Sequence, residues 1–270
     1  MYCGMHLLFR RVGLPGMLLM LLAPALWPAS PAFAAGLVET VTRVKPSIVG
    51  VATHQMVRSP RTRLLGTGFV VADGNHVITN EHVLPESLDA AANEFLVIAI
   101  VGEGGRESEV RRAERVSVDV ARDLALLRFE GAPLPALELG EAAPAHEGQA
   151  VAFTGFPIGT RLGLVPATHR GTISAITRIV MPPRAAREIT PATARRLRDP
   201  FEIYQLDATA YPGNSGSPLF EPEGGAVLGV VNMVFVQEGG EPTSRPSGIS
   251  YAIPVRYVRH LLSQADLLPR

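Results

Sequence analysis

The 270-residue sequence has a single cysteine, a single tryptophan and no excess of either charge. The cysteine, Cys3, stands at the start of the chain, which excludes disulfides, thiolate catalysis and cysteine-rich zinc sites from the rest. The 25 basic residues balance the 25 acidic ones. This balance argues against nucleic acid or an anionic membrane surface as the main partner, because both attract proteins with a basic excess. At 47% hydrophobic and 19% charged, the chain is neither disordered nor fibrous.

The first 34 residues contain no acidic residue and differ from the rest of the chain. Their apolar run, Leu14–Trp27, follows a pair of arginines and is shorter than the roughly 20 residues that span a bilayer. Ala32-Phe33-Ala34 then forms a small-x-small cleavage site. The pattern predicts a cleavable signal peptide over residues 1–34, with a membrane anchor as the less favoured alternative. We therefore expect a periplasmic or secreted mature chain of residues 35–270, without a membrane span.

Short apolar segments, rich in Val, Ile and Phe and bounded by Gly, Pro, Asp or Asn, recur along the mature sequence. This pattern is typical of strands, and many strands with few helical intervals predict an all-β sandwich or a pair of barrels. One short helix is expected at Val38–Lys45, and an amphipathic helix is expected over residues 254–265. The expected strands are Ser47–Thr53, Thr67–Val71, His76–Thr79, Phe95–Val101, Leu124–Phe129, Gln149–Thr154, Arg170–Thr177, Phe201–Leu206, Pro218–Phe220, Ala226–Val236 and Gly248–Ile253.

Ser215 lies between glycines in the segment Pro212-Gly213-Asn214-Ser215-Gly216-Ser217-Pro218. Such a segment turns tightly and exposes its serine, and its glycines let backbone N–H groups converge on one point, as a developing oxyanion requires. Taken alone, the segment is better explained as a polar turn before the strand Pro218–Phe220. A serine hydroxyl also needs a neighbouring base before it becomes a good nucleophile.

His82 and Asp123 are the residues best placed to activate that serine. His82 stands at the end of the apolar strand that begins at His76, which fixes the direction of its side chain. Asp123 immediately precedes the apolar segment Leu124–Phe129, where a carboxylate is shielded from water and can orient a base. Asp119 and Asp207 are the competing carboxylates.

In this order and context, His82, Asp123 and Ser215 resemble the triad of trypsin-like serine proteases, and most closely the bacterial HtrA/Deg type. The resemblance covers nearly all of the mature chain. Its motifs are Gly66–Val71, Thr79–Val83, Asp123–Leu127, Leu134–Gly140, Gly155–Gly159, Gly171–Ile176, Gln205–Ala208 with the serine segment, and Gly248–Pro254. Eight modest motifs in the right order make a specific match.

The resemblance implies two six-stranded antiparallel β-barrels, roughly residues 35–140 and 141–253, with a C-terminal helix at 254–265. It implies that Ser215 is the nucleophile, His82 the general base and Asp123 the orienting acid. The backbone N–H groups of Gly213 and Ser215 would form the oxyanion hole. It implies no cofactor and no metal ion, and it assigns Asp207 a structural role.

The sequence departs from the HtrA/Deg pattern in three places. That family usually carries PDZ domains after the protease domain, and none follows the predicted helix, so we expect no PDZ-based peptide sensing. Ser217 stands where the family usually has Gly or Ala. The segment Met181–Pro200 is predicted to be a longer surface loop than usual, and by analogy it could gate the active site.

Substrate preference is partly readable from the residues that resemble the main specificity pocket. Thr209, six residues before Ser215, replaces the aspartate that would pair with a cationic side chain, and the nearby strand with Val230 and Val231 is apolar. We therefore expect cleavage after small or medium aliphatic residues.

The leading hypothesis is thus a serine endopeptidase that acts on polypeptides, and the resemblance suggests unfolded envelope proteins as substrates. The alternatives are a catalytically silent, protease-like binding module and a metal hydrolase, but the chain has no His-Glu-x-x-His motif for the latter. The sequence leaves both a monomer and a trimer open.

Overall fold

A computed structural model describes Met1 and residues 36–102, 107–141, 143, 145–157, 164–179, 200–232 and 248–268. Apart from Met1, the predicted signal peptide lies outside the described residues, and so does the predicted loop Met181–Pro200 apart from Pro200. Ala34–Arg270 forms one compact unit. None of the helices in the described ranges is both long enough and apolar enough to cross a membrane.

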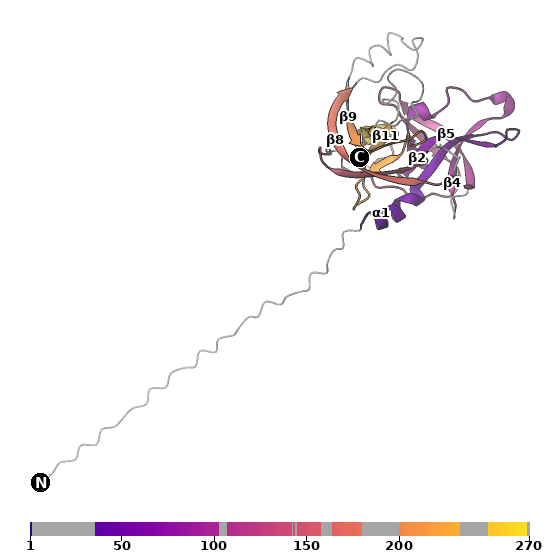
Figure 1. Cartoon of the computed structure of the whole chain (residues 1–270). Coiled ribbons are helices and arrows are strands. Elements are labelled where there is room, and N and C mark those ends of the chain that lie inside the picture. The colour runs from indigo at the N-terminus through magenta and orange to yellow at the C-terminus, as the bar shows by residue number, and fades with distance from the viewer. Residues whose placement is uncertain are drawn as a thin grey trace. The chain divides into compact units, whose positions relative to one another are not determined.

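The strands in the described residues form two closed, six-stranded antiparallel barrels, which confirms the predicted fold class. The strand order is β1-β2-β3-β6-β5-β4 in the first barrel and β10-β11-β12-β9-β8-β7 in the second. Figure 1 shows the first barrel in indigo to magenta beside the second in salmon to yellow. The first barrel comprises β1 (Ile48–His54), β2 (Thr62–Val71), β3 (His76–Thr79), β4 (Phe95–Val101), β5 (Glu107–Asp119) and β6 (Leu124–Phe129). The second comprises β7 (Ala150–Gly155), β8 (Ala167–Ile179), β9 (Phe201–Asp207), β10 (Pro218–Phe220), β11 (Val227–Asn232) and β12 (Ile249–Pro254).

Helices lie at the two ends of the barrel pair in the sequence. α1 (Leu37–Val44) precedes the first barrel, and α3 (Val255–Gln264) follows the second, with Pro254 as its N-cap residue. Both match the predicted helices to within a residue. Three short 3-10 helices, η1 (Lys45–Ser47), η2 (Glu81–Val83) and η3 (Ala90–Ala92), complete the described elements. Of these, η2 carries His82, which the sequence had placed at the end of the preceding strand, whereas that strand, β3, ends at Thr79.

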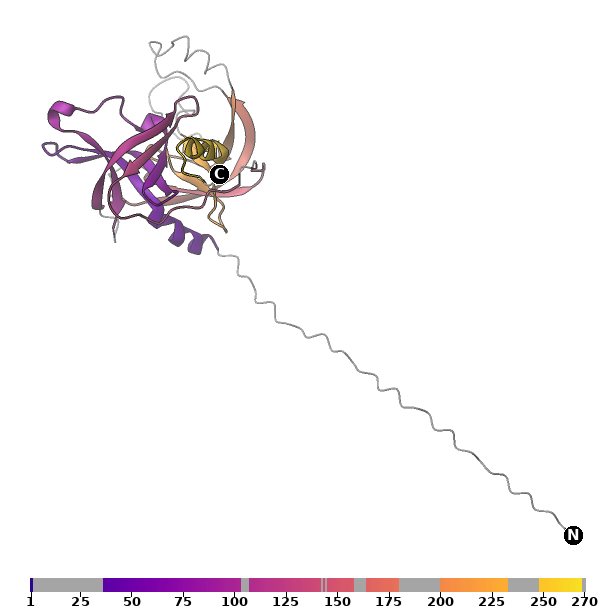
Figure 2. The same cartoon turned by 180° about the vertical axis from the view of Figure 1, so that it is seen from behind.

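The largest hydrophobic cluster joins the two barrels and the C-terminal helix. It contains Phe69 and Leu126 from the first barrel, Phe220 from the second, and Val258 and Leu261 from α3. The helix accordingly contacts β5 and β6 as well as β11 and β12, and Figure 2 shows it from behind as the coil at the yellow end of the colour scale. The shared core therefore fixes the first barrel against the second.

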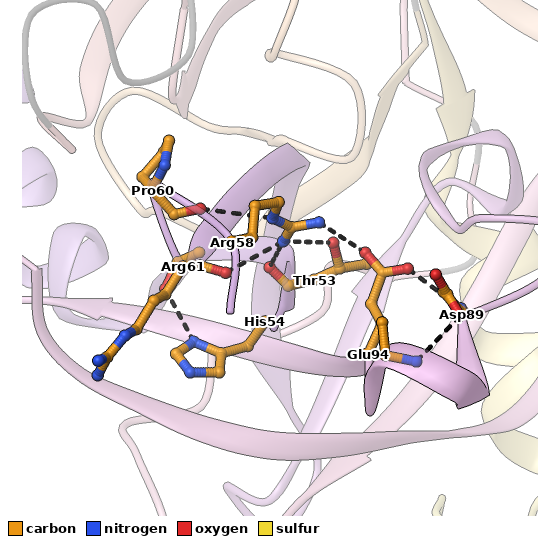
Figure 3. Close-up of polar contacts among 9 residues, drawn as sticks. Thr53, His54, Arg58, Pro60, Arg61, Asp89 and Glu94 are labelled. Atoms are coloured by element: carbon orange, nitrogen blue, oxygen red, sulfur yellow. Dashed lines mark hydrogen bonds and ion pairs between the residues drawn. The ribbon is translucent and has the colours of Figure 1, made fainter. Parts of the chain in front are cut away.

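A polar cluster around Arg58 fastens the loop between β1 and β2 onto the first barrel. The guanidinium of Arg58 donates to a Glu94 carboxylate oxygen at 2.7 Å and to the Thr53 carbonyl oxygen at 2.8 Å. It also donates to the carbonyl oxygen of Arg61 at 3.1 Å, and Figure 3 shows these bonds converging on one side chain. The hydrogen bonds from Thr53 and Arg58 lower the pKa of Glu94 to about 2, so this carboxyl stays ionised at neutral pH.

Candidate active site

Ser215 sits in a tight turn between β9 and β10. Gly213 and Gly216 both have positive φ angles, +100° and +88°, which glycine adopts without the steric cost that a Cβ brings. The turn is closed by backbone bonds, from Asn214 to the Tyr211 carbonyl at 2.9 Å and from Ser217 to the Asn214 carbonyl at 3.0 Å. The glycines thus allow the chain to fold back and hold Ser215 at the junction of the barrels.

His82 lies between the carboxylate of Asp123 and the hydroxyl of Ser215. Its Nδ1 is 2.5 Å from Asp123 Oδ2, and its Nε2 is 2.9 Å from Ser215 Oγ. Because a carboxylate only accepts, the proton is assigned to Nδ1, which leaves Nε2 free to accept from the serine hydroxyl. The structure therefore brings together, from both barrels, the three side chains singled out in the sequence.

Asp123 is held by several hydrogen bonds that the sequence pattern did not predict. Its side chain is 1% exposed, and its φ of +53° lies in the left-handed region, which aspartate tolerates better than most residues. Its Oδ1 accepts from the backbone N–H of His82 at 2.7 Å, and its Oδ2 accepts from Asn232 Nδ2 at 2.6 Å. Asn80 Nδ2 donates to the carbonyl oxygen of Asp123 at 3.0 Å. These bonds set the direction of the carboxylate.

Asn232 is a functional candidate that sequence reasoning missed. It ends the apolar strand β11, is fully buried and reaches the triad from the second barrel. A lone polar residue at the end of an otherwise apolar strand was the available signal, because a buried amide requires a hydrogen-bond partner.

The backbone of the serine turn leaves two donors unused. Among the described residues, the N–H groups of Gly213 and Ser215 have no protein acceptor, whereas those of Asn214, Gly216 and Ser217 each donate to a backbone carbonyl. Unpaired donors that flank a nucleophile are what an oxyanion hole requires. The geometry is thus compatible with the predicted oxyanion hole.

The residues predicted to line the substrate pocket lie in different environments. Thr209 is half-buried in the segment between β9 and the serine turn. Val230 and Val231 are both fully buried in β11, in two different hydrophobic clusters. Their assignment to the pocket stays a prediction, and the residues that follow Asn232 lie outside the described range.

Among the described residues, neither of the competing carboxylates, Asp119 and Asp207, bonds to His82. Asp119 ends β5 and pairs with Arg122 at 2.8 Å, and Asp207 ends β9 in register with Thr172 and Ile249. His76 bonds to Asp73 at 2.7 Å. Within the described parts of the chain, no three His, Cys, Asp or Glu side chains gather as metal ligands.

Comparison with known proteins agrees with this geometry. Residues 66–230 match a family model described as a trypsin-like peptidase domain. A probable periplasmic serine endoprotease, DegP-like, from Halomonas elongata is 34% identical over 197 residues, which cover 73% of this chain and 34% of that protein. Its counterpart from Pseudomonas fluorescens is 31% identical over 208 residues, covering 73% of this chain and 35% of that protein. The chain thus spans about a third of the length of the curated relatives it matches.

A solved structure is similar over most of the chain. The active form of the Rv3671c protease from M. tuberculosis superposes with a TM-score of 0.59 at 25% identity, covering 83% of this chain and 82% of that one. The family match, these relatives and the two-barrel fold all point the same way. The chain belongs to the trypsin-like peptidase family and is homologous to DegP-like HtrA proteases over the protease region.

Proposed function

We propose that this chain is a serine endopeptidase in which Ser215 is the nucleophile, His82 the general base and Asp123 the group that orients His82. The observation that carries the proposal is the unbroken chain of contacts from Asp123 Oδ2 through His82 to Ser215 Oγ, at 2.5 Å and 2.9 Å. The side chains grade in exposure from 1% at Asp123 to 18% at His82, so the carboxylate is shielded while the imidazole remains within reach of a substrate.

The reaction would proceed in two halves. Ser215 Oγ attacks the carbonyl carbon of the scissile bond as its proton passes to His82 Nε2, and Asp123 stabilises the resulting imidazolium. The N–H groups of Gly213 and Ser215 bind the oxyanion. His82 then protonates the leaving amine, the C–N bond breaks, and an acyl-enzyme remains on Ser215. Water, deprotonated by His82, releases the acyl group by the reverse sequence of steps.

We further propose export and a preference for unfolded polypeptides, cut after small or medium aliphatic residues. The signal-peptide pattern over residues 1–34 and the periplasmic DegP-like relatives support export. The absence of an acidic residue at position 209 supports the aliphatic preference, because a cationic side chain would lack a partner there. Cleavage of a peptide library mainly after Arg or Lys would overturn this preference. Monomer and trimer remain the two candidate assembly states.

The decisive experiment is labelling of the purified mature chain with a fluorophosphonate probe. We expect covalent labelling of the wild type and its complete loss in Ser215→Ala. Ser217→Ala is a matched control, because it removes a second serine hydroxyl from the same turn and should leave labelling intact. If the wild type stays unlabelled, with and without unfolded protein present, the chain is instead the catalytically silent binding module.

A further inference from the structure

We propose that Thr67 is a positioning residue that holds the oxyanion-hole turn onto the first barrel. The inference deepens the proposed peptidase function and rests on it. Thr67 lies in β2, has no exposed surface and cannot touch a substrate. Two of its hydrogen-bond partners, however, are Gly213 and Ser215, whose N–H groups would form the predicted oxyanion hole and which belong to the second barrel.

All the polar groups of Thr67 have hydrogen-bond partners, and three of the four bonds cross to the second barrel. The hydroxyl donates to the Gly213 carbonyl oxygen at 2.7 Å and accepts from the backbone N–H of Phe156 at 3.0 Å. The backbone N–H donates to the Ser215 carbonyl oxygen at 2.9 Å. The carbonyl oxygen accepts from the Thr79 hydroxyl at 2.7 Å. Thr67 therefore holds the turn by two hydrogen bonds, one to the carbonyl before the Ser215 N–H and one to the carbonyl after it.

The turn needs these hydrogen bonds to the first barrel because glycine residues stand on both sides of Ser215. Gly213 and Gly216 have wide backbone freedom, so the turn has little stiffness of its own. A peptide group is planar, so anchoring the Gly213 carbonyl also fixes the adjoining N–H of Asn214 and the path of the chain into Ser215. Without the hydroxyl of Thr67, the Gly213–Asn214 peptide could rotate and misdirect the donors.

The packing leaves no room for a substitute partner. A Cβ at Gly216 would lie 2.0 Å from the carbonyl oxygen of Thr67, and one at Gly155 would lie 2.9 Å from its hydroxyl oxygen. The strand and the turn thus meet backbone to backbone. Valine at position 67 has nearly the same shape as threonine, but it would leave the buried Gly213 carbonyl and the buried Phe156 N–H without their partner.

The test compares Thr67→Val with Thr67→Ser, which restores a hydroxyl, and with Thr40→Val. Thr40 is a matched control, because its buried hydroxyl donates at 3.0 Å to the carbonyl of Glu223, in another turn of the second barrel. Steady-state kinetics on a peptide substrate and amide hydrogen exchange of the segment 211–217 are measured for each folded variant. Amide hydrogen exchange reports the mobility of the turn directly, even if the protein shows no catalytic turnover.

We expect Thr67→Val to lower kcat about 10- to 100-fold, less than the roughly 10²- to 10³-fold cost of deleting an oxyanion donor. KM should change little, and exchange in 211–217 should rise. Thr67→Ser should recover most of both, and Thr40→Val should change neither. An unchanged kcat in Thr67→Val, or a loss of kcat without faster exchange in the turn, would overturn the inference. Failure of wild-type labelling would instead count against the peptidase proposal, and the exchange arm would still decide whether Thr67 holds the turn.

Discussion

His169, in β8, shows how burial sets the charge of one residue next to the serine turn. Its ring stacks on Phe153, with centroids 4.8 Å apart, and tilts against Tyr211 at 5.9 Å. The backbone carbonyl oxygen of Tyr211 in turn accepts the hydrogen bond from the Asn214 N–H that closes the serine turn. Burial lowers the pKa of His169 below its usual 6.5, because removal from water disfavours the charged imidazolium.

The lowered pKa of His169 predicts a loss of stability in acid. The stability that the neutral ring contributes is fully present above the unfolded-state pKa of 6.5 and is lost as the pH falls through the lower folded-state pKa. His169→Phe keeps the stacking and removes the titration, so its Tm should fall less than that of the wild type between about pH 7.5 and pH 5.5. His146→Gln, at an exposed histidine, is the control. Parallel Tm profiles for wild type and His169→Phe would contradict the prediction.

Removal of the buried Ser217 hydroxyl is expected to stabilise the protein, which is an uncommon effect for such a substitution. Within the described residues its Oγ is buried without a hydrogen-bond partner. An unpaired buried polar group costs roughly 1–3 kcal/mol, so Ser217→Ala should raise the free energy of unfolding by about 1 kcal/mol. Urea denaturation measures this change. A lower midpoint for the variant would mean that the hydroxyl has a partner in solution, such as a buried water.

At the residue scale, the sequence predicted the three residues of the proposed triad, but not the residues that hold Asp123 and the serine turn in place. His82, Asp123 and Ser215 stand beside recognisable strand ends and glycines. Asn232 and Thr67 act across the barrel junction, over 109 and 146 residues of sequence. Their roles depend on tertiary contacts, which no local spacing encodes.

Among the elements, β5 is the strand that the apolar-segment pattern failed to predict. Glu107–Asp119 is rich in arginine and glutamate, because much of its surface faces solvent, and Val116, Val118 and other side chains are exposed. The start of β2 and both ends of β8 were also placed too far inward, since these parts of the strands are half-buried or exposed. The fully buried strands β3 and β10 were predicted to the residue. The fully buried β11 begins one residue after the predicted start at Ala226, and the last four residues of that prediction lie outside the described residues.

The Arg58 cluster predicts how the β1–β2 loop depends on one side chain. Arg58→Ala leaves the mostly buried Glu94 carboxylate, 12% exposed, without its cation, and should lower the free energy of unfolding by about 1–3 kcal/mol. Arg61→Ala is the matched control, because Arg61 joins the cluster through its carbonyl oxygen and not through its side chain. Thermal unfolding at neutral pH checks the difference. Equal effects of the two variants would show that the hydrogen bonds of the Arg58 side chain add no stability.

For the whole molecule, the core shared by both barrels and α3 predicts cooperative unfolding. Leu261, in α3, is 1% exposed within that core, so Leu261→Ala should cost about 2–5 kcal/mol. Because the same cluster supports both barrels, calorimetry should show one transition that moves to lower temperature as a unit. His260→Ala, on the exposed side of the helix, should change little. Two separate transitions in Leu261→Ala would show that the barrels are stabilised independently.

The long-range bonds of the site also set an order of events while the chain is being synthesised. The strands of the first barrel end at Phe129, so His82 and Asp123 emerge from the ribosome well before Ser215. Asn232, whose side-chain amide donates to the Asp123 carboxylate, emerges later still. A nascent chain therefore carries the proposed base and the proposed acid, but not the proposed nucleophile, until synthesis has passed residue 215. If the proposed triad is correct, a chain stalled or truncated before that point lacks the serine and cannot cleave neighbouring proteins.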